Sequence, residues 1–539
     1  MKQLLFAAVA AAVLAGCGAD RTAEAVRGAV RDGDLAKAST TIAELYGTDS
    51  DEVLVRAMDE GLIQHLGGQL DQSAATFDRA VPLVDENRNQ GVVDSAASWV
   101  ANDTVVRFRG RAHENLQVDW FRALNHLLAA QAQDGTWRPP ALLVARTPQP
   151  PVPLPAADLA PVDHRERAVN AARRLTLATA KREGDDRAAA RALVDDPAAR
   201  LLAAATVMAL PRAERGESDE QFAAAMLTQA VKGYQAATIG YAGKSWRYEV
   251  AGVPALVERL RLRQLASYDP AAVADAPGLA TARLLPGQGS VLLLNHVGFC
   301  ARTEPLQIGL IAAGRAAPEP SPAERLRGAS STTFTLGALA FYAKGPGAEI
   351  ANSWIALPVP GWLVQQALAP GGAAIIGFEI PVHRTDRPIG SHGLLRVDGD
   401  QGQPLVVVAD LDAQARAALS DDQPLIVLRT LARVLAKQSL VAVGAKQADA
   451  RDGGLLGFVV NLAGSALATW SESADLRCWL TLHDHVSAVL VDLPAGSHRL
   501  ALDTAHGTVD LGEVVVAEGR LAVLSLRTFT PETEDRTDP

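Results

Sequence analysis

The fold class is decided by the stretch LLPGQGSVLLLNH, Leu284–His296, where the spacing of apolar residues changes from that of helices to that of strands. Before it, from Thr22 to about Leu265, apolar residues recur at helical spacing in an alanine-rich chain. After Ser290 the apolar residues are consecutive, as in a buried strand. The sequence therefore predicts an α+β protein, with an α-helical N-terminal region followed by a β-rich C-terminal region that carries a short helical insert.

Two helical segments near the N-terminus share a pattern. Gly33–Ala38 (GDLAKA) is similar in character to Gly68–Ser73 (GQLDQS), and tetratricopeptide repeats have a comparable period of about 34 residues. Gly61 falls where the first helix of such a repeat approaches the second, and Phe77 and Ala80 fall at its large and small packing positions. The region resembles tetratricopeptide repeats; because the spacing drifts after residue 85, a helical bundle without repeat symmetry is the alternative. Either arrangement stacks helix pairs and offers an extended surface.

The second half reads mostly as strands. Apolar and β-branched runs bounded by Gly, Pro and Asp predict strands at 290–296, 374–382, 404–409 and 457–462, with helices at 412–419 and 423–437 between them. A meander follows, with strands at 488–493, 498–502, 512–517 and 520–526, and the turn Pro494–Gly496 predicts a hairpin. This last region resembles the small β modules, of the PEGA sort, found on bacterial surface proteins.

The N-terminus carries a targeting signal. Lys2 is followed by an apolar run, Leu4–Leu14, that is shorter than the roughly 20 residues needed to span a bilayer, so it reads as the core of a signal peptide. Leu14–Cys17 (LAGC) resembles the bacterial lipobox, which implies cleavage before Cys17 and acylation of that residue with several chains, including palmitate. Gly18, in place of Asp, points to the outer membrane. We expect a lipoprotein that faces the periplasm.

These patterns divide the chain into six parts. Seven prolines in Arg138–Pro155 favour an extended connector over a helix. The predicted parts are a lipoprotein signal peptide (1–16), a helical repeat region (17–137), a Pro-rich linker (138–160), a second helical region (161–280), a β-rich domain (281–530) and a disordered acidic tail (531–539).

Composition excludes several classes of protein. Apolar residues make up 48% of the 539 residues and charged residues 21%, as in a globular protein with a sizeable core. The formal net charge is −10, so no general basic field is present to hold nucleic acid. Three cysteines are too few for a disulfide framework or a four-thiolate zinc site. Cys300 and Cys478 remain after lipidation and could form one disulfide, which their spacing does not decide.

One cluster of charges is a candidate for ionic packing or for an anion site. Arg429, Arg433 and Lys437 stand at i, i+4 and i+8 on one stripe of a predicted helix, and Asp475 and Arg477 precede Trp479 on a predicted strand. We prefer ion pairing that docks the helix onto the sheet, with Asp475 as one acceptor. The alternative is a site for an anion or a partner's carboxylate.

The sequence points to no catalytic residue, metal or cofactor. Gly-x-Ser-x-Gly, Ser-x-x-Lys and His-Glu-x-x-His are absent, and Gly243–Ser245 lacks the preceding glycine of a P-loop. His483 and His485 stand two apart and would share one face of a strand, but a third ligand is not identifiable; His498 and Asp484 are guesses. We favour histidines without a metal.

Several short motifs along the chain resemble a family of bacterial outer-membrane lipoproteins with helical repeats before a β-rich domain. Besides the lipobox, the motifs are Arg122–Leu127 (RALNHL), Ile355–Pro358 (IALP), Arg429–Lys437 (RTLARVLAK), Ala474–Trp479 (ADLRCW) and Leu480–Leu482 (LTL). His483 stands where the family tends to have proline. Such lipoproteins are often encoded beside relatives of penicillin-binding-protein activators, which implies a role in envelope assembly, and no catalytic residues carry over.

We therefore expect a non-enzymatic, membrane-anchored scaffold or adaptor in cell-envelope assembly. Its helices would bind envelope proteins, and the lipidated Cys17 would bind the membrane. The alternative is a ligand-binding protein or hydrolase that acts on cell-wall or carbohydrate material through the β-rich half.

Overall fold

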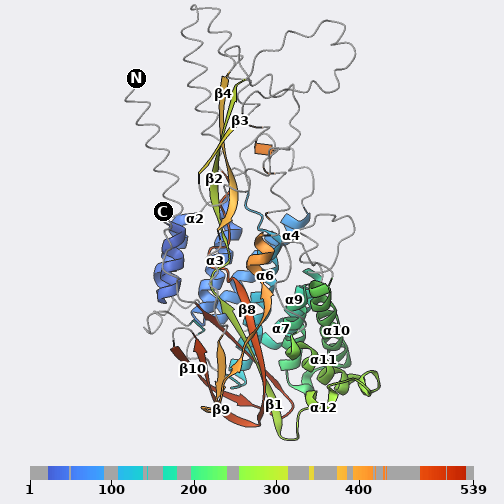
Figure 1. The fold of residues 1–539 in the computed structure, drawn as a ribbon. Coiled ribbons are helices and arrows are strands. Elements are labelled where there is room, and N and C mark those ends of the chain that lie inside the picture. The colour runs from blue at the N-terminus through green and yellow to red at the C-terminus, as the bar shows by residue number, and fades with distance from the viewer. Residues whose placement is uncertain are drawn as a thin grey trace, which may run out of the picture.

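The computed structural model describes most of the body of the protein. The described residues are 22–47, 50–89, 107–137, 142–143, 162–178, 196–239, 254–313, 339–344, 373–384, 393–416, 419, 426, 429–430, 433, 474–504 and 507–529. Helices lie in the N-terminal half and strands in the C-terminal half, which confirms the predicted α+β layout (Figure 1). The signal peptide, Cys17, the predicted strand at 457–462 and the acidic tail lie outside these residues.

The N-terminal helices pack on their neighbours in sequence, α2 on α3, α3 on α4 and α4 on α6. They are a helix at 22–32, α2 (Leu35–Tyr46), the 3-10 helix η1 (Ser50–Glu52), α3 (Val53–Leu66), α4 (Leu70–Asn89) and α6 (Ala112–Gln133).

Gly61 lets α3 and α4 approach closely. A Cβ atom on Gly61 would lie 2.7 Å from Cζ of Phe77, closer than real contacts allow. Ser73 Oγ also donates a hydrogen bond to the Gly61 carbonyl oxygen at 2.6 Å. Phe77 and Ala80 are fully buried. These residues occupy the packing positions expected for them, and the type of repeat stays a prediction.

A second group of helices lies beside the first (Figure 1). It contains α7 (His164–Ala178), α9 (Pro197–Ala209), η3 (Arg212–Glu214), α10 (Glu217–Ile239), α11 (Ala255–Tyr268), η4 (Pro270–Val273) and α12 (Leu279–Ala282). Every residue of α9 is buried, since α7 and α10 pack against it and strand β11 lies on another side. Its small alanine side chains allow these close approaches.

The central sheet, sheet B, has the strand order β11-β1-β8-β7. Its strands are β1 (Gln288–Val297), β7 (Val406–Asp410), β8 (His485–Pro494) and β11 (Leu521–Thr528). β1 pairs with β11 in parallel and with β8 antiparallel. All but the first residue of β1 are buried, and β11 is buried throughout, so the consecutive apolar residues at 291–294 reflect a strand covered on both faces.

Sheet A has the order β10-β9-β5-β6, and all its strand pairs are antiparallel. Its strands are β5 (Leu394–Val397), β6 (Gln403–Pro404), β9 (Gly496–Thr504) and β10 (Gly507–Val516). The hairpin predicted at Pro494–Gly496 is wrong, because β8 and β9 belong to different sheets. The two strands also differ in burial, since β8 is buried nearly throughout and β9 is half exposed.

Sheet C is a ribbon with the order β3-β2-β4, built from β2 (Arg302–Ala313), β3 (Leu339–Lys344) and β4 (Ala373–Arg384). β2 and β4 pair antiparallel over twelve registers, from Arg302 opposite Arg384 to Ala313 opposite Ala373. The ribbon extends from the body past the labelled helices (Figure 1). Residues 411–416 form a helix, which overlaps the helix predicted at 412–419.

One hydrophobic core joins both groups of helices to sheets A and B. Helix α6 lies at its centre, with all but four of its 22 residues buried. Gln131 of α6 covers the edge of β11, because its side-chain amide donates to the Val523 carbonyl oxygen at 2.6 Å and accepts from the Val523 N–H at 2.8 Å. The helices and the sheets therefore depend on each other for burial.

Candidate functional site

Residues 474–484 form the junction between the N-terminal helices and sheet B. The sequence predicted a strand here, and the structure corrects this, because no residue of 474–484 belongs to a strand or a helix. Residues 478–484 are nonetheless buried without a break. Buried backbone groups need hydrogen-bond partners, and side chains from elsewhere supply several of them. We call residues 477–482 the clamped segment.

Two buried carboxylates accept hydrogen bonds from the clamped segment. Glu114 of α6 accepts from the N–H of Trp479 at 2.8 Å, through Oε1. Asp59 of α3 accepts from both the N–H and the hydroxyl of Thr481, at 2.9 and 2.8 Å. Tyr46 of α2 donates its hydroxyl to the other oxygen of Asp59 at 3.1 Å. Side chains of α3 and α6 thereby hold Trp479 and Thr481, which flank Leu480 in a turn, and α2 supports the carboxylate of α3.

Two buried arginines bind carbonyl oxygens in the same region. Arg27, on the helix at 22–32, donates to Leu480 at 3.0 Å and to Cys300 at 2.8 Å. Arg527 at the end of β11 donates to Thr481 at 3.0 Å. Each arginine is 1% exposed. Charged side chains therefore bind both donors and acceptors of this buried backbone, and hydrogen bonds to charged groups are the stronger ones.

Burial sets the charge state of this junction. It raises the pKa of Asp59 to about 7, although the hydrogen bonds from Thr481 and Tyr46 lower it. Burial also lowers the pKa of Arg527 to about 9, and the neighbouring charge of Arg27 lowers it further. Both arginines stack on Phe299, with guanidinium carbons 5.1 and 5.2 Å from the ring centre, which favours their charged forms.

Aromatic and histidine rings fill the space beside the clamped segment. Phe121 of α6 lies 6.1 Å from the ring of Trp479, 5.3 Å from His296 and 5.6 Å from His483. The His296 and His483 rings meet edge to face at 4.6 Å. Burial lowers the pKa of both histidines well below the usual value, so the two rings pack as neutral groups at pH 7.

The predicted charge cluster is described only in part. Asp475 and Arg477 come together as a two-point ion pair, with both nitrogen–oxygen distances 2.9 Å, and Arg477 lies 5.8 Å above the ring of Phe108. Arg433 is buried and donates to Thr430 at 3.3 Å. Arg429 is also described, but Lys437 lies outside the described residues, so the docking of the stripe onto the sheet stays a prediction.

The paired histidines of the sequence do not form a metal site within the described residues. His483 packs against other rings, His485 lies 3.0 Å from Asp484, and His498 contacts Asp398, which follows β5, at 2.7 Å. In the part of the chain that the structure describes, no three His, Cys, Asp or Glu side chains gather as metal ligands.

The disulfide that the sequence left undecided is not formed. Cys300 and Cys478 are both buried free thiols. Burial raises the pKa of both, which keeps them protonated.

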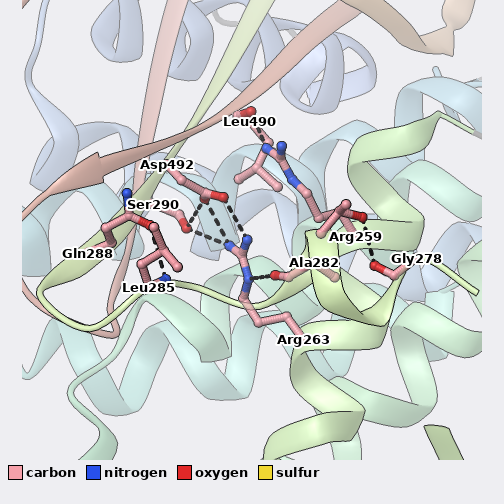
Figure 2. Close-up of polar contacts among 10 residues, drawn as sticks. Arg259, Arg263, Gly278, Ala282, Leu285, Gln288, Ser290, Leu490 and Asp492 are labelled. Atoms are coloured by element: carbon pink, nitrogen blue, oxygen red, sulfur yellow. Dashed lines mark hydrogen bonds and ion pairs between the residues drawn. The ribbon is translucent and has the colours of Figure 1, made fainter. Parts of the chain in front are cut away.

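A second ionic junction holds helix α11 against sheet B (Figure 2). Arg263 reaches both oxygens of Asp492 in β8, at 3.2 and 2.9 Å, and donates to the hydroxyl of Ser290 in β1 at 2.6 Å. Ser290 donates in turn to Asp492 at 2.8 Å. Arg259, one turn earlier on α11, donates to the carbonyl oxygen of Leu490. Like the clamped segment, this junction ties a helix to the sheet.

The sequence did not single out Arg27, Asp59 or Glu114. One signal was available for Asp59, which stands four residues after Val55 and four before Ile63, both of them buried. A charge on the apolar face of a helix needs an internal partner.

No family model, curated protein or solved structure matches this chain. None of the described helices is long and apolar enough to cross a membrane.

Proposed function

We propose that this chain is a lipid-anchored, non-enzymatic scaffold or adaptor of the outer membrane that faces the periplasm and binds envelope proteins. The observation that carries the proposal is the clamped segment. Side chains from the N-terminal helices bind the backbone of a buried turn at Trp479, Leu480 and Thr481, so this helical layer already binds a peptide backbone within its own chain.

The two ionic junctions support the same proposal. Asp59 and Glu114 hold α3 and α6 on the clamped segment that precedes β8, and Asp492 of β8 holds α11 on sheet B. A body tied together in this way can present its surfaces in a constant arrangement, which is what a scaffold requires. The lipobox at Leu14–Cys17 supports the anchor, since several acyl chains bind a membrane stably.

Partner binding through the helices is tested best by photo-crosslinking in cells. Removal of the helices would expose the core of sheet B, so single positions are preferable. A photoreactive amino acid replaces Leu177 in α7 or Val53 in α3, which are 73% and 42% exposed. The matched control is Val515 in β10, which is 47% exposed. We expect one envelope protein to be captured from a helical position and not from Val515.

Two outcomes would contradict the proposal. Capture from Val515 alone, or co-purification of glycan without protein, would favour a ligand-binding protein or hydrolase that acts through the β-rich half. Metabolic labelling with palmitate tests the anchor, with Cys17→Ala as the negative control. If the wild-type chain takes up no more label than Cys17→Ala, the lipid anchor is contradicted.

A further inference from the structure

His498 joins two turns at one corner of the β-rich region. It lies on β9, two residues after the turn Pro494–Gly496 that leads from sheet B to sheet A. Its ring Nδ1 lies 2.7 Å from Oδ2 of Asp398, which follows β5. Its Nε2 lies 2.8 Å from the carbonyl oxygen of Pro494, the last residue of β8. The ring therefore connects the turn between β5 and β6 with the end of β8.

Both partners of the His498 ring accept hydrogen bonds and donate none. Hydrogen bonds from His498 and from the N–H of Arg499 hold the pKa of Asp398 below its usual value, so this carboxyl is ionised at neutral pH. The other partner is a carbonyl oxygen. A neutral imidazole has one N–H and one bare nitrogen, and only the charged ring donates from both nitrogens. The two contacts together therefore require a protonated, positively charged His498.

The charge that acts on His498 comes from Asp398. Burial by itself would lower the pKa of His498, but the hydrogen bonds to Asp398 and to Pro494 outweigh burial and raise this pKa. Opposite His498 on β10 stands Val514, which carries no charge. The charged side chains of the neighbouring segments bind other groups: Arg499 binds Asp510, Arg396 binds Asp503, Glu513 binds the hydroxyl of Ser497, and Glu518 binds the N–H of Gly287.

Asp398 also holds the backbone of the turn that follows β5. Its φ angle is 52°, in the left-handed region that residues other than glycine rarely adopt. Its N–H donates to the carbonyl oxygen of Arg499 at 2.9 Å, and its Oδ1 accepts from the N–H of Arg499 at 2.9 Å. The second carboxylate oxygen binds His498. The proton on His498 thus helps to keep this turn in a conformation that is otherwise unfavourable.

We propose that His498 is a pH-sensitive switch, which in its protonated form holds the β5–β6 turn and the end of β8 together and which releases one of them when it loses a proton. The neutral ring keeps a single N–H, so it donates either to Asp398 or to Pro494. Unfolded histidine has a pKa near 6.5, and the folded protein binds this proton more tightly. The stabilisation is therefore complete below about pH 6.5 and is lost as the pH rises through the folded pKa. The switch is closed in acid and opens at mildly alkaline pH.

NMR titration of the histidine ring signals in the full chain tests the protonation of His498. The signal of His498 is identified by its absence from His498→Gln. We expect a midpoint above pH 6.5, and Asp398→Asn, which removes the charge but keeps the size of the side chain, should lower the midpoint by about one pH unit. Asp400→Asn removes a carboxylate from the same turn and should leave the midpoint unchanged. A wild-type midpoint at or below pH 6.5, or an equal effect of both substitutions, would overturn the proposal.

Urea unfolding at pH 6 and pH 9 tests whether the proton stabilises the fold. At pH 6, His498→Gln should raise the unfolding equilibrium constant by roughly tenfold, the factor that corresponds to a pKa shift of one unit. At pH 9 the variant and the wild type should unfold alike, because the wild-type ring has then lost its proton. A destabilisation that is the same at both pH values would show that His498 acts through packing alone. That result, or no destabilisation at pH 6, would also overturn the proposal.

Discussion

Lowering the pH from 7 to 5 should destabilise this fold strongly, because buried histidines are held as neutral rings. Burial lowers the pKa of His65 to about 4, of His126 to about 4 and of His383 to about 3. In the folded protein His65 faces Asn125, with 2.6 Å between its Nδ1 and the amide oxygen, and no described carboxylate accepts from its ring. Burial shifts the pKa of three further histidines in the same direction; they are His113, His296 and His483.

The direction of this pH effect follows from which state of the protein, folded or unfolded, binds protons first. Unfolded histidine has a pKa near 6.5, so the unfolded chain binds protons first as the pH falls, and the free energy of unfolding decreases below about pH 6.5. A histidine with a folded pKa of about 4 loses about 2 kcal/mol between pH 7 and pH 5. His65, His126 and His383 together lose about 6 kcal/mol.

Two carboxyls act in the opposite direction. Because burial raises the pKa of Asp59 to about 7, acidification relieves the cost of its buried charge and returns about 2 kcal/mol by pH 5. The raised pKa of Glu114 has the same sign. The loss from the three histidines, less the return from Asp59, leaves a net decrease in unfolding free energy of about 4 kcal/mol. This is a large part of the 5–15 kcal/mol typical of a folded domain.

Urea unfolding followed by circular dichroism at pH 7, 6 and 5 measures this loss. His65→Gln should reduce the decrease in unfolding free energy between pH 6 and pH 5 by about 1 kcal/mol, because the unfolded chain then binds one proton fewer. His498, whose hydrogen bond with Asp398 raises its pKa, is the control, and His498→Gln should not reduce the decrease. Equal unfolding free energies at pH 7 and pH 5 would refute the reasoning. So would a decrease in unfolding free energy between pH 6 and pH 5 that is the same in His65→Gln as in the wild type.

Three substitutions test the packing and the junctions by thermal or urea unfolding. Gly61→Ala should cost about 1–3 kcal/mol, since the new methyl group would overlap Phe77. Asp492→Ala should cost about 2–4 kcal/mol, because it leaves the Arg263 guanidinium, which is 13% exposed, without its carboxylate. Gln131→Ala should cost about 2–4 kcal/mol, as two buried backbone groups of β11 lose their partners.

Matched substitutions separate these effects from general sensitivity to mutation. Gly28→Ala places its methyl group in open space within a helix and should be neutral or stabilise by up to about 1 kcal/mol. Glu258→Ala removes the partner of Arg261 at the surface of α11 and should cost less than about 1 kcal/mol. A control that costs as much as its partner would mean that the named contact does not carry the effect.

Local patterns predicted those parts of the fold whose residues respond to their immediate neighbours in sequence. The apolar stretch at 290–296 became β1, and the C-terminal runs became β8 to β11, because alternation and turn residues act over a few positions. β2 was not predicted at all, although residues 308–313 form a run without polar side chains, as residues 291–294 do. The hairpin at Pro494–Gly496 failed because a turn does not specify which sheet the next strand joins.

The sequence by itself determined the α+β layout, the absence of a basic field, and the lipobox on which the proposed anchor depends. Only the tertiary structure decided that residues 477–482 belong to no strand and form a turn at 480–481. Arg27, Asp59 and Glu114 lie 453, 422 and 365 positions from the residues whose backbone they bind. Their roles come from desolvation and from hydrogen bonds that exist only once the helices pack on the sheet, and no local pattern encodes a partner several hundred residues away.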